Sequence, residues 1–243
     1  MTNDNHDKLY AIDMEKITDF VFDDRVVKVF ADMVRRSVPG YATLLSMLPV
    51  IVRHFVTAGS RCYDLGCSQG ACTLAMRHSL QHNDVRIIAV DNSPSMVASC
   101  REQITLDHAR APVDVSCEDV CETSISNASL VVMNFTLQFV EPSRRAALLR
   151  QIHAGLNPGG ALLLSEKIRL PDSEADLMTA LHEEFKRANG YSELEISQKR
   201  SALENVLVAE SVEEHKQHLY DAGFSRVVVW FQCFNFVSLL AIK

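Results

Sequence analysis

The stretch Cys62-Tyr63-Asp64-Leu65-Gly66-Cys67-Ser68-Gln69-Gly70 decides the fold of this chain. It has the pattern of a strand end, a tight glycine turn and the first turn of a helix. The apolar spacing of residues 71–76, directly after it, is typical of a helix that packs against a sheet. Glycine lets a backbone approach a ligand without a Cβ in the way, and a helix N-terminus offers unpaired N–H groups. The stretch therefore predicts a strand, a ligand-binding loop and a helix in succession.

Two kinds of ligand suit such a loop, and a turn without any ligand is the simpler alternative. A dinucleotide site requires the pattern G-x-G-x-x-G, whereas this chain has Gly66, Ser68 and Ala71 at those positions. The second glycine is missing at the point where a pyrophosphate would lie against the backbone. Asp64, by contrast, is a carboxylate beside backbone N–H donors, and such a group can hold the ammonium of an amino acid. This pattern resembles the first motif of S-adenosyl-L-methionine (SAM)-dependent methyltransferases.

The composition indicates a compact soluble protein. With 243 residues, 47% of them hydrophobic, the chain can bury one sizeable core. No charged segment followed by an apolar run opens the sequence, and no apolar stretch is long enough to cross a bilayer, so we expect a cytoplasmic protein without membrane contact. The seven cysteines include no CxxC pair, and no His cluster accompanies Cys117 and Cys121. We therefore expect reduced thiols and no metal.

The charge balance disfavours direct binding to nucleic acid. The chain has 24 Lys and Arg against 31 Asp and Glu, a net charge of −7 at pH 7. Proteins that grip RNA or DNA through phosphates usually carry a basic face, and here only Lys186-Arg187 and Lys199-Arg200 form basic clusters. We therefore expect a small-molecule substrate and no direct nucleic-acid binding.

The N-terminal part is predicted to contain a tail and then helices. Residues 1–22 are polar and mixed in character, and we expect a flexible tail there. Residues 23–243 are expected to form a single domain that begins with helices within residues 23–56, which partly cover the glycine loop. Tyr41 follows a Pro-Gly pair between these helices, so it either points into the site or only packs against its neighbours.

Beyond the glycine loop, predicted strands and helices alternate. The first five strands are predicted at residues 61–65, 85–90, 113–117, 130–133 and 161–166, and the helices between them at 73–80, 95–107 and 141–156. Continuous apolar runs of this kind suit parallel strands that are covered on both faces. The last two strands, 227–233 and 236–242, lie too close together in the chain for a parallel crossover. They are therefore expected to pair antiparallel.

One segment breaks this alternation. Residues from about 173 to 208 are charged and helical in pattern, and they are too many for a simple connection. We expect a helical insertion that caps the carboxyl ends of the strands, where inserted segments often contact substrates. The predicted fold class is α/β, a Rossmann-like class I methyltransferase fold. It comprises a mostly parallel seven-stranded sheet with an antiparallel C-terminal strand, N-terminal helices and the helical cap insertion.

Polar residues follow three more of the predicted strands. Asp91 ends the second strand, where an acid can accept hydrogen bonds from both hydroxyls of a ribose. Asp119 follows the third strand and could bond an adenine amino group, while Val120 beside it would cover the ring. Asn134 lies at the carboxyl end of the fourth strand, the edge where α/β sheets bind their ligands. Together with the glycine loop, these residues favour a SAM site over a dinucleotide site.

The chain resembles the bacterial carboxy-S-adenosyl-L-methionine synthases. The runs that carry the resemblance are residues 36–41, 63–68, 91–94, 134–139, 185–200 and 230–236. The similarity extends over nearly everything from about residue 20 onward, and the first twenty residues show no match. The run at 185–200, within the predicted cap, is the most specific.

The resemblance implies a particular reaction and a place in tRNA modification. The family converts SAM and prephenate into carboxy-SAM and phenylpyruvate, and the carboxyl lost by prephenate ends on the SAM methyl carbon. The family's proposed mechanism forms a sulfonium ylide that captures carbon dioxide, with hydroxide expelled from prephenate as the base. The product passes to a tRNA carboxymethyltransferase, which modifies a wobble uridine. The resemblance also implies a homodimer.

The resemblance further assigns roles to residues of this chain. Gly66, Cys67 and Ser68 would lie along the methionine portion of SAM, next to Asp64. The remaining assignments place Asp91 with Asn92 at the ribose, Asp119 with Val120 at the adenine, Tyr41 and Asn134 around the reacting methyl, and Arg200 at the new carboxylate. Composition alone would make Arg200 a solvated charge on a helix face. The resemblance favours the role in binding, because a guanidinium holds a carboxylate through two hydrogen bonds.

Several alternatives stay open at this point. The chain could be an ordinary SAM-dependent methyltransferase acting on a small acid, a tRNA methyltransferase, or a SAM-binding protein without catalysis. Arg200 could serve its own subunit or a neighbouring one. The cationic residues that could hold the carboxylates of prephenate are Arg35, Arg36, Lys186, Arg187 and Lys199, in no order of preference.

Overall fold

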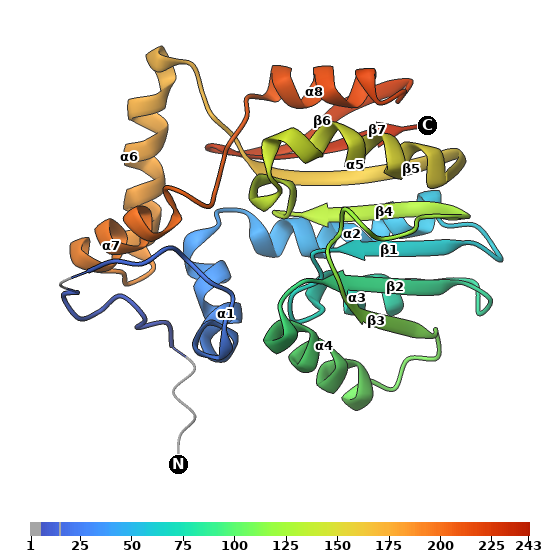
Figure 1. Cartoon of the computed structure of the whole chain (residues 1–243), viewed down its shortest axis with the longest axis horizontal. Helices are drawn as coiled ribbons and strands as arrows, with labels where there is room; N and C mark the ends of the chain where they lie inside the picture. Colours follow the sequence, from blue (N-terminus) through green and yellow to red (C-terminus); the bar gives the residue numbers. More distant parts are fainter. Residues whose placement is uncertain (1–5, 15) are drawn as a thin grey trace.

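The computed structural model describes residues 6–14 and 16–243, and it shows a single sheet with helices on both faces (Figure 1). The strands of the described residues are β1 (Arg61–Leu65), β2 (Arg86–Asp91), β3 (Val113–Cys117), β4 (Ala128–Asn134), β5 (Leu156–Lys167), β6 (Arg226–Cys233) and β7 (Phe236–Ile242). They form a seven-stranded sheet in the order β3-β2-β1-β4-β5-β7-β6. Neighbours from β3 to β5 are parallel, whereas β7 runs antiparallel to β5 and β6. The predicted fold class is confirmed.

The apolar runs explain why β1 and β4 lie at the centre of the sheet. Every residue of β4 before Asn134 is buried, as is every residue of β1 after Arg61. The parallel register places Asp64 of β1 beside Ala89 of β2 and Val132 of β4. Because parallel strands end at the same edge of a sheet, the polar residues that follow these strands are brought together there.

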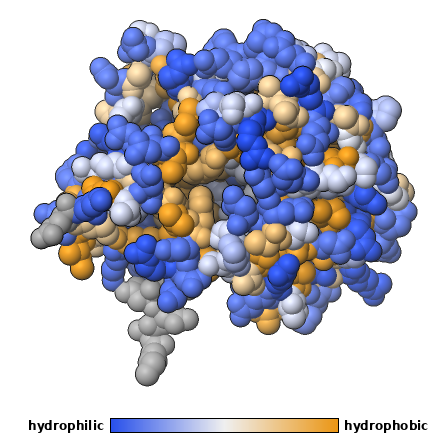
Figure 2. All heavy atoms as spheres, viewed as in Figure 1, coloured by the Kyte–Doolittle hydropathy of each residue, from blue (hydrophilic) through white to orange (hydrophobic). Residues whose placement is uncertain are grey.

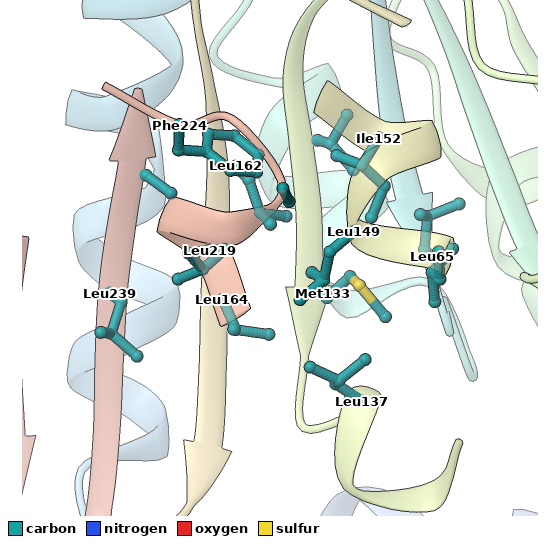
Figure 3. Close-up of a cluster of buried hydrophobic side chains, with 14 of the residues drawn as sticks. Leu65, Met133, Leu137, Leu149, Ile152, Leu162, Leu164, Leu219, Phe224 and Leu239 are labelled. Atoms are coloured by element: carbon teal, nitrogen blue, oxygen red, sulfur yellow. The ribbon is translucent and has the colours of Figure 1, made fainter. Parts of the chain in front are cut away.

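Helices cover both faces of the sheet. One face carries α2 (Tyr41–Phe55), α3 (Ala71–Arg77) and α4 (Pro94–Leu106), and the other carries α5 (Pro142–Gly155) and α8 (Val212–Asp221). Figure 3 shows the second face, where Leu149 and Ile152 of α5 and Leu219 of α8 pack among Met133 and Leu164 of the strands. Burying one large apolar side chain stabilises the folded state by about 1.5–3 kcal/mol. The apolar side chains packed on the two faces of the sheet are therefore the main source of stability.

The carboxyl edge of the sheet is covered by three further helices. These are α1 (Asp24–Ser37), α6 (Asp172–Ala188) and α7 (Glu193–Leu203), which Figure 1 shows beyond the arrowheads of the parallel strands. The predicted insertion at about 173–208 thus consists of α6, α7 and the turn that joins them at Gly190, whose φ is +85°. Ser192 then caps α7 together with Glu195, which explains where the second helix begins.

The described residues of the N-terminal segment differ from the flexible tail that we expected for residues 1–22. Asp7 is only 1% exposed. Its carboxylate accepts a hydrogen bond from the Tyr191 hydroxyl at 2.5 Å, and its backbone N–H donates to the Asp32 carboxylate at 2.9 Å. Phe20 is buried with residues of α1, α4 and α7. Residues 6–14 and 16–22 therefore lie against α1 and the cap, while residues 1–5 and 15 are outside the described residues.

Element boundaries differ from the prediction mainly at turns. The helix expected at 73–80 is α3, which starts at Ala71 and ends at Arg77. The strand expected at 161–166 begins earlier, because Leu156 pairs with Ala128 before the register shifts toward Leu130. Residues 157–160, which lie between the predicted helix and the predicted strand, are thus an irregular part of β5. No helix among residues 6–14 and 16–243 is long and apolar enough to cross a membrane.

Candidate active site at the carboxyl edge of the sheet

A cavity of about 950 Å³ lies between the carboxyl edge of the sheet and the helices that cover it. Figure 2 shows this face hollowed near its middle, with hydrophobic side chains gathered along one side of the hollow. The structure brings all the predicted site residues to this cavity, which is lined by Tyr41, Asp64, Gly66, Cys67, Ser68, Asp91, Asn92, Asp119, Val120, Asn134 and Arg200. These residues therefore lie on the wall of one cavity, and their roles in binding or catalysis stay predictions.

The glycine loop turns back on itself between β1 and α3. The backbone N–H groups of Gly66 and Cys67 both donate to the Val90 carbonyl, at 2.8 and 2.9 Å. Gly66 and Ser68 have φ values of +84° and +47°, in the left-handed region. A Cβ on Gly66 would overlap the Thr136 side chain. The loop therefore requires glycine at position 66, and its tight turn leaves Cys67 and Ser68 facing the cavity.

Replacing this glycine tests the construction of the loop. Gly66→Ala should lower the free energy of unfolding by about 2–5 kcal/mol, because the left-handed backbone is strained and the new methyl overlaps Thr136. Gly159→Ala is a matched control, since its φ is +76° and an added Cβ would meet nothing within 4 Å. The control should cost about 1–2 kcal/mol, from the backbone alone. If chemical denaturation showed the same loss of unfolding free energy for both variants, the close approach of Thr136 to Gly66 would be contradicted.

Asp64 is a buried acid at the end of β1. It is 1% exposed, and the Thr73 hydroxyl donates to its carboxylate at 2.5 Å. Burial raises the pKa of Asp64 to about 6, although the hydrogen bonds from Thr73 lower it. A carboxylate that lines a cavity with so little solvent gains strongly from a cationic partner. The site can therefore hold an ammonium group at this point.

Asp91 ends β2 and is oriented by the backbone on both sides. Ser68 N–H donates to one carboxylate oxygen and Ser93 N–H to the other, each at 2.9 Å. Burial raises the pKa of Asp91, and the two N–H groups oppose that shift. Each oxygen keeps a lone pair for a ligand. With Asn92 beside it on the cavity wall, the carboxylate is oriented to accept two neighbouring hydroxyl groups.

Asp119 forms an ion pair with Arg144, which the sequence analysis did not predict. The Arg144 guanidinium of α5 donates to its carboxylate at 2.6 Å, and the Cys121 N–H donates to the other oxygen at 2.9 Å. The bond from the Cys121 backbone and the charge of Arg144 lower the pKa of Asp119, so it is ionised. Val120 is 8% exposed and adds an apolar surface beside it. Because Arg144 comes from α5, no local pattern near Asp119 indicated it.

Three aromatic rings of the cavity wall lie near one another. Tyr41 begins α2, directly after Gly40, whose φ is +80°. Its ring centroid lies 6.4 Å from that of Phe135, which in turn lies 5.9 Å from Phe236. Asn134, between Phe135 and the buried part of β4, also lines the cavity. Phe135 and Phe236 were not predicted as site residues, although both stand at strand ends on the ligand-binding edge.

Cationic side chains line the cap side of the cavity. They are Lys167, the last residue of β5, together with Lys186 of α6 and Lys199 and Arg200 of α7. Arg200 lines the cavity of its own chain, is 61% exposed and pairs with Glu183. Along the strand order the lining thus changes from acids, which lie after β3, at the end of β2 and near the end of β1, to an amide at the end of β4 and a lysine at the end of β5. The described residues contain no group of three or more side chains arranged to hold a metal ion.

These features define a class of protein. A glycine loop after the first strand, acids at or just beyond the ends of the first three strands and an antiparallel last strand are those of the SAM-dependent methyltransferase fold. A family model described as a methyltransferase domain matches residues 63–160. A solved structure from Methanococcus maripaludis, assigned to the SAM-dependent methyltransferases, has a TM-score of 0.62 at 22% identity, covering 95% of this chain and 97% of its own. That likeness concerns the fold.

Close relatives identify the family. The chain is 53% identical over 240 residues to the carboxy-S-adenosyl-L-methionine synthase of Escherichia coli strain K12. The alignment covers 98% of this chain and 97% of the relative. The synthase of the same name from Escherichia fergusonii matches with the same identity and coverage. The chain belongs to the carboxy-S-adenosyl-L-methionine synthase family and is an enzyme of that family. The resemblance stated from the sequence is confirmed, but the expectation that the first twenty residues show no match is wrong, because the alignment covers 98% of the chain and therefore includes most of them.

Proposed function

We propose that this enzyme converts SAM and prephenate into carboxy-SAM and phenylpyruvate. The observation that carries the proposal is the charge distribution of one cavity, in which carboxylates predominate on the glycine-loop side and cations outnumber acids on the cap side. SAM offers an ammonium group and ribose hydroxyls to the first side. Prephenate carries two carboxylates, which match the second. Membership of the synthase family supports this pairing of substrates.

SAM would lie along the acidic side of the cavity. Asp64 holds its ammonium group, and Gly66, Cys67 and Ser68 run along its methionine portion. Asp91, next to Asn92, accepts from the ribose hydroxyls, because its two oxygens are already aimed by backbone N–H groups. Asp119 and Val120 receive the adenine. This arrangement directs the methyl group toward the aromatic part of the cavity wall formed by Tyr41, Phe135 and Phe236.

The proposed reaction balances without an added oxidant or reductant. Prephenate loses its ring carboxyl as carbon dioxide and its ring hydroxyl as hydroxide, and its ring becomes aromatic. The hydroxide removes a proton from the SAM methyl group and becomes water, which leaves a sulfonium ylide. The ylide carbon then bonds to the carbon dioxide. The net change is SAM plus prephenate to carboxy-SAM, phenylpyruvate and water.

The protein's part would be positioning and electrostatic stabilisation. Arg200 holds the new carboxylate, and Tyr41 with Asn134 frames the reacting methyl group. Burial raises the pKa of Tyr41, so its hydroxyl stays protonated at neutral pH and acts as a hydrogen-bond donor. A base supplied by prephenate agrees with this, because Tyr41 does not itself accept the proton.

Outside the reaction, we propose that the product serves tRNA modification without direct contact between this chain and tRNA. Carboxy-SAM passes to a tRNA carboxymethyltransferase that modifies the wobble uridine. The net charge of −7 supports the absence of direct nucleic-acid binding. We further propose a cytoplasmic homodimer that requires no metal.

The proposed contact of Asp64 predicts how SAM binding depends on pH. Only the ionised carboxylate attracts the ammonium group, and burial raises the pKa of Asp64 to about 6. The dissociation constant of SAM should therefore be constant above that pKa and rise by about tenfold for each pH unit below it. Calorimetric titration of the wild type and of Asp64→Asn over this range checks the prediction. The variant should bind weakly with a smaller dependence on pH, and a flat wild-type profile would contradict the role of Asp64.

The nature of the released product separates this proposal from its closest rival. Transfer of an intact methyl group must release S-adenosylhomocysteine, whereas carboxylation of SAM does not. We expect the enzyme, given SAM and prephenate, to release phenylpyruvate without a matching amount of S-adenosylhomocysteine. Stoichiometric S-adenosylhomocysteine would instead assign the chain to ordinary methyl transfer.

A further inference from the structure

Most of the cations that sequence reasoning offered for prephenate are already paired. Arg35 and Arg36 both pair with Asp32, and neither lines the cavity. Arg187 pairs with Glu193 at the surface. Lys199 donates to the Ser37 hydroxyl at 2.9 Å and lies 3.5 Å from the Asp7 carboxylate. The contacts of Lys199 join the cap to α1 and to the N-terminal segment.

Two lysines differ from this set. Lys186 in the last turn of α6 and Lys167 at the end of β5 both line the cavity, and both are partly buried. Within residues 6–14 and 16–243, neither side chain forms a hydrogen bond or an ion pair. Glu183, an acid of the same wall, forms ion pairs with Arg200 and Arg187. The two ammonium groups therefore face the cavity without an anion.

An anionic ligand would offset the repulsion between the positive charges of Lys167 and Lys186 and the cost of burying them. Burial, together with the charges of Lys167 and Lys199, lowers the pKa of Lys186 to about 7. Burial and the charge of Arg200 lower the pKa of Lys167. His182, on the same wall, adds no charge, since burial lowers its pKa to about 3. Cations held this close together without a partner favour a bound carboxylate strongly.

The wall beside the two lysines is aromatic. Phe236 follows β6 and pairs with Lys167 across the sheet, and its ring lies 4.9 Å from His182 and 5.9 Å from Phe135. This surface suits a six-membered ring that becomes aromatic during the reaction. A molecule with a ring and a carboxylate on a short side chain can therefore lie with its ring on Phe135 and Phe236 and its side chain toward the lysines.

We propose that Lys167 and Lys186 bind the carboxylate of the pyruvyl side chain of prephenate, the one that remains on phenylpyruvate. The inference rests on the proposed function and adds residues that it leaves unassigned. The ring carboxylate must become neutral carbon dioxide, and two ammonium groups bound to it would stabilise the ground state and slow that loss. The side-chain carboxylate keeps its charge throughout, so the same contact can anchor substrate and product.

Steady-state kinetics of charge-neutral variants tests the proposal. Lys167→Gln and Lys186→Gln should each raise KM for prephenate by about 10- to 100-fold, the loss expected for one charge-assisted contact. The dissociation constant of SAM should change by less than about threefold, since SAM lies on the acidic side. Lys186→Arg should recover part of the loss because it keeps the charge. Lys28→Gln, an exposed lysine of α1 that does not line the cavity, is the control.

Binding of phenylpyruvate shows which carboxylate of prephenate the lysines contact, because phenylpyruvate retains only the carboxylate of the side chain. Its affinity for the SAM-bound enzyme, measured by calorimetry, should fall in both glutamine variants by the same factor as that for prephenate. Weaker prephenate binding with unchanged phenylpyruvate binding would place the lysines at the ring carboxylate and overturn the proposal. Unchanged affinity for both would overturn it as well. If the wild type formed no carboxy-SAM, the proposed function would fail, whereas phenylpyruvate binding would still test the lysine pair.

Discussion

Arg200→Ala is expected to lower kcat/KM for prephenate by about 10- to 100-fold, because a guanidinium that binds a developing carboxylate through two hydrogen bonds contributes about 1.5–3 kcal/mol. Arg200 lines the cavity of its own chain and is 61% exposed, with Glu183 as its partner. Binding the new carboxylate would then require Arg200 to leave Glu183 or to share it. The rate of carboxy-SAM formation at saturating SAM is the quantity to measure.

Two controls sharpen this expectation. Arg200→Lys keeps the charge but loses the paired geometry, so its activity should lie between those of the wild type and Arg200→Ala. Arg35→Ala removes an exposed arginine of α1 that is paired with Asp32 and lies outside the cavity wall, and its kcat/KM should stay close to that of the wild type. An Arg200→Ala enzyme as active as Arg35→Ala would exclude Arg200 from the reaction.

Asp91→Ala is expected to raise the dissociation constant of SAM by about 100- to 1,000-fold, because two hydrogen bonds from the ribose to a carboxylate are lost. The substitution also leaves the N–H groups of Ser68 and Ser93 without their acceptor. The thermal stability of the ligand-free protein should therefore be measured beside the affinity.

A matched control for Asp91 lies on the neighbouring strand. Asp114 of β3 is about half exposed, pairs with Arg86 at the surface and does not line the cavity. Asp114→Ala should therefore leave the affinity for SAM unchanged. If Asp91→Ala remained folded and bound SAM as tightly as Asp114→Ala, the ribose would have to lie elsewhere.

The apolar pattern of the sequence was sufficient to predict the strands and the residues at their carboxyl ends. The strands at 61–65 and 113–117 were predicted with the bounds that the structure gives. Asp64, Asp91 and Asn134 could be placed at one edge because parallel strands end on the same side of a sheet. Their gathering in one cavity follows from topology, so it needed no knowledge of side-chain contacts.

Contacts between distant parts of the chain could not be predicted in this way. The Tyr191 hydroxyl bonds Asp7 across 184 positions, so the polar composition of residues 1–22 indicated a tail although Asp7 is buried. Lys167 directly follows the strand predicted at 161–166, and no local pattern indicated a site there, because its place on the cavity wall depends on how α6 and α7 cover the carboxyl edge of the sheet. Which cation is left without a partner depends on every ion pair around it. That information exists only in the folded chain.

The most direct test of the proposed reaction is mass spectrometry of the enzyme incubated with SAM and prephenate, with the ring carboxyl of prephenate labelled with carbon-13. The proposal predicts a SAM species heavier by one carbon dioxide that carries the label, together with unlabelled phenylpyruvate. It also predicts no such species when prephenate is omitted. Unchanged SAM, from enzyme shown to bind SAM, or a heavier species without the label would contradict the transfer of the prephenate carboxyl to the SAM methyl carbon.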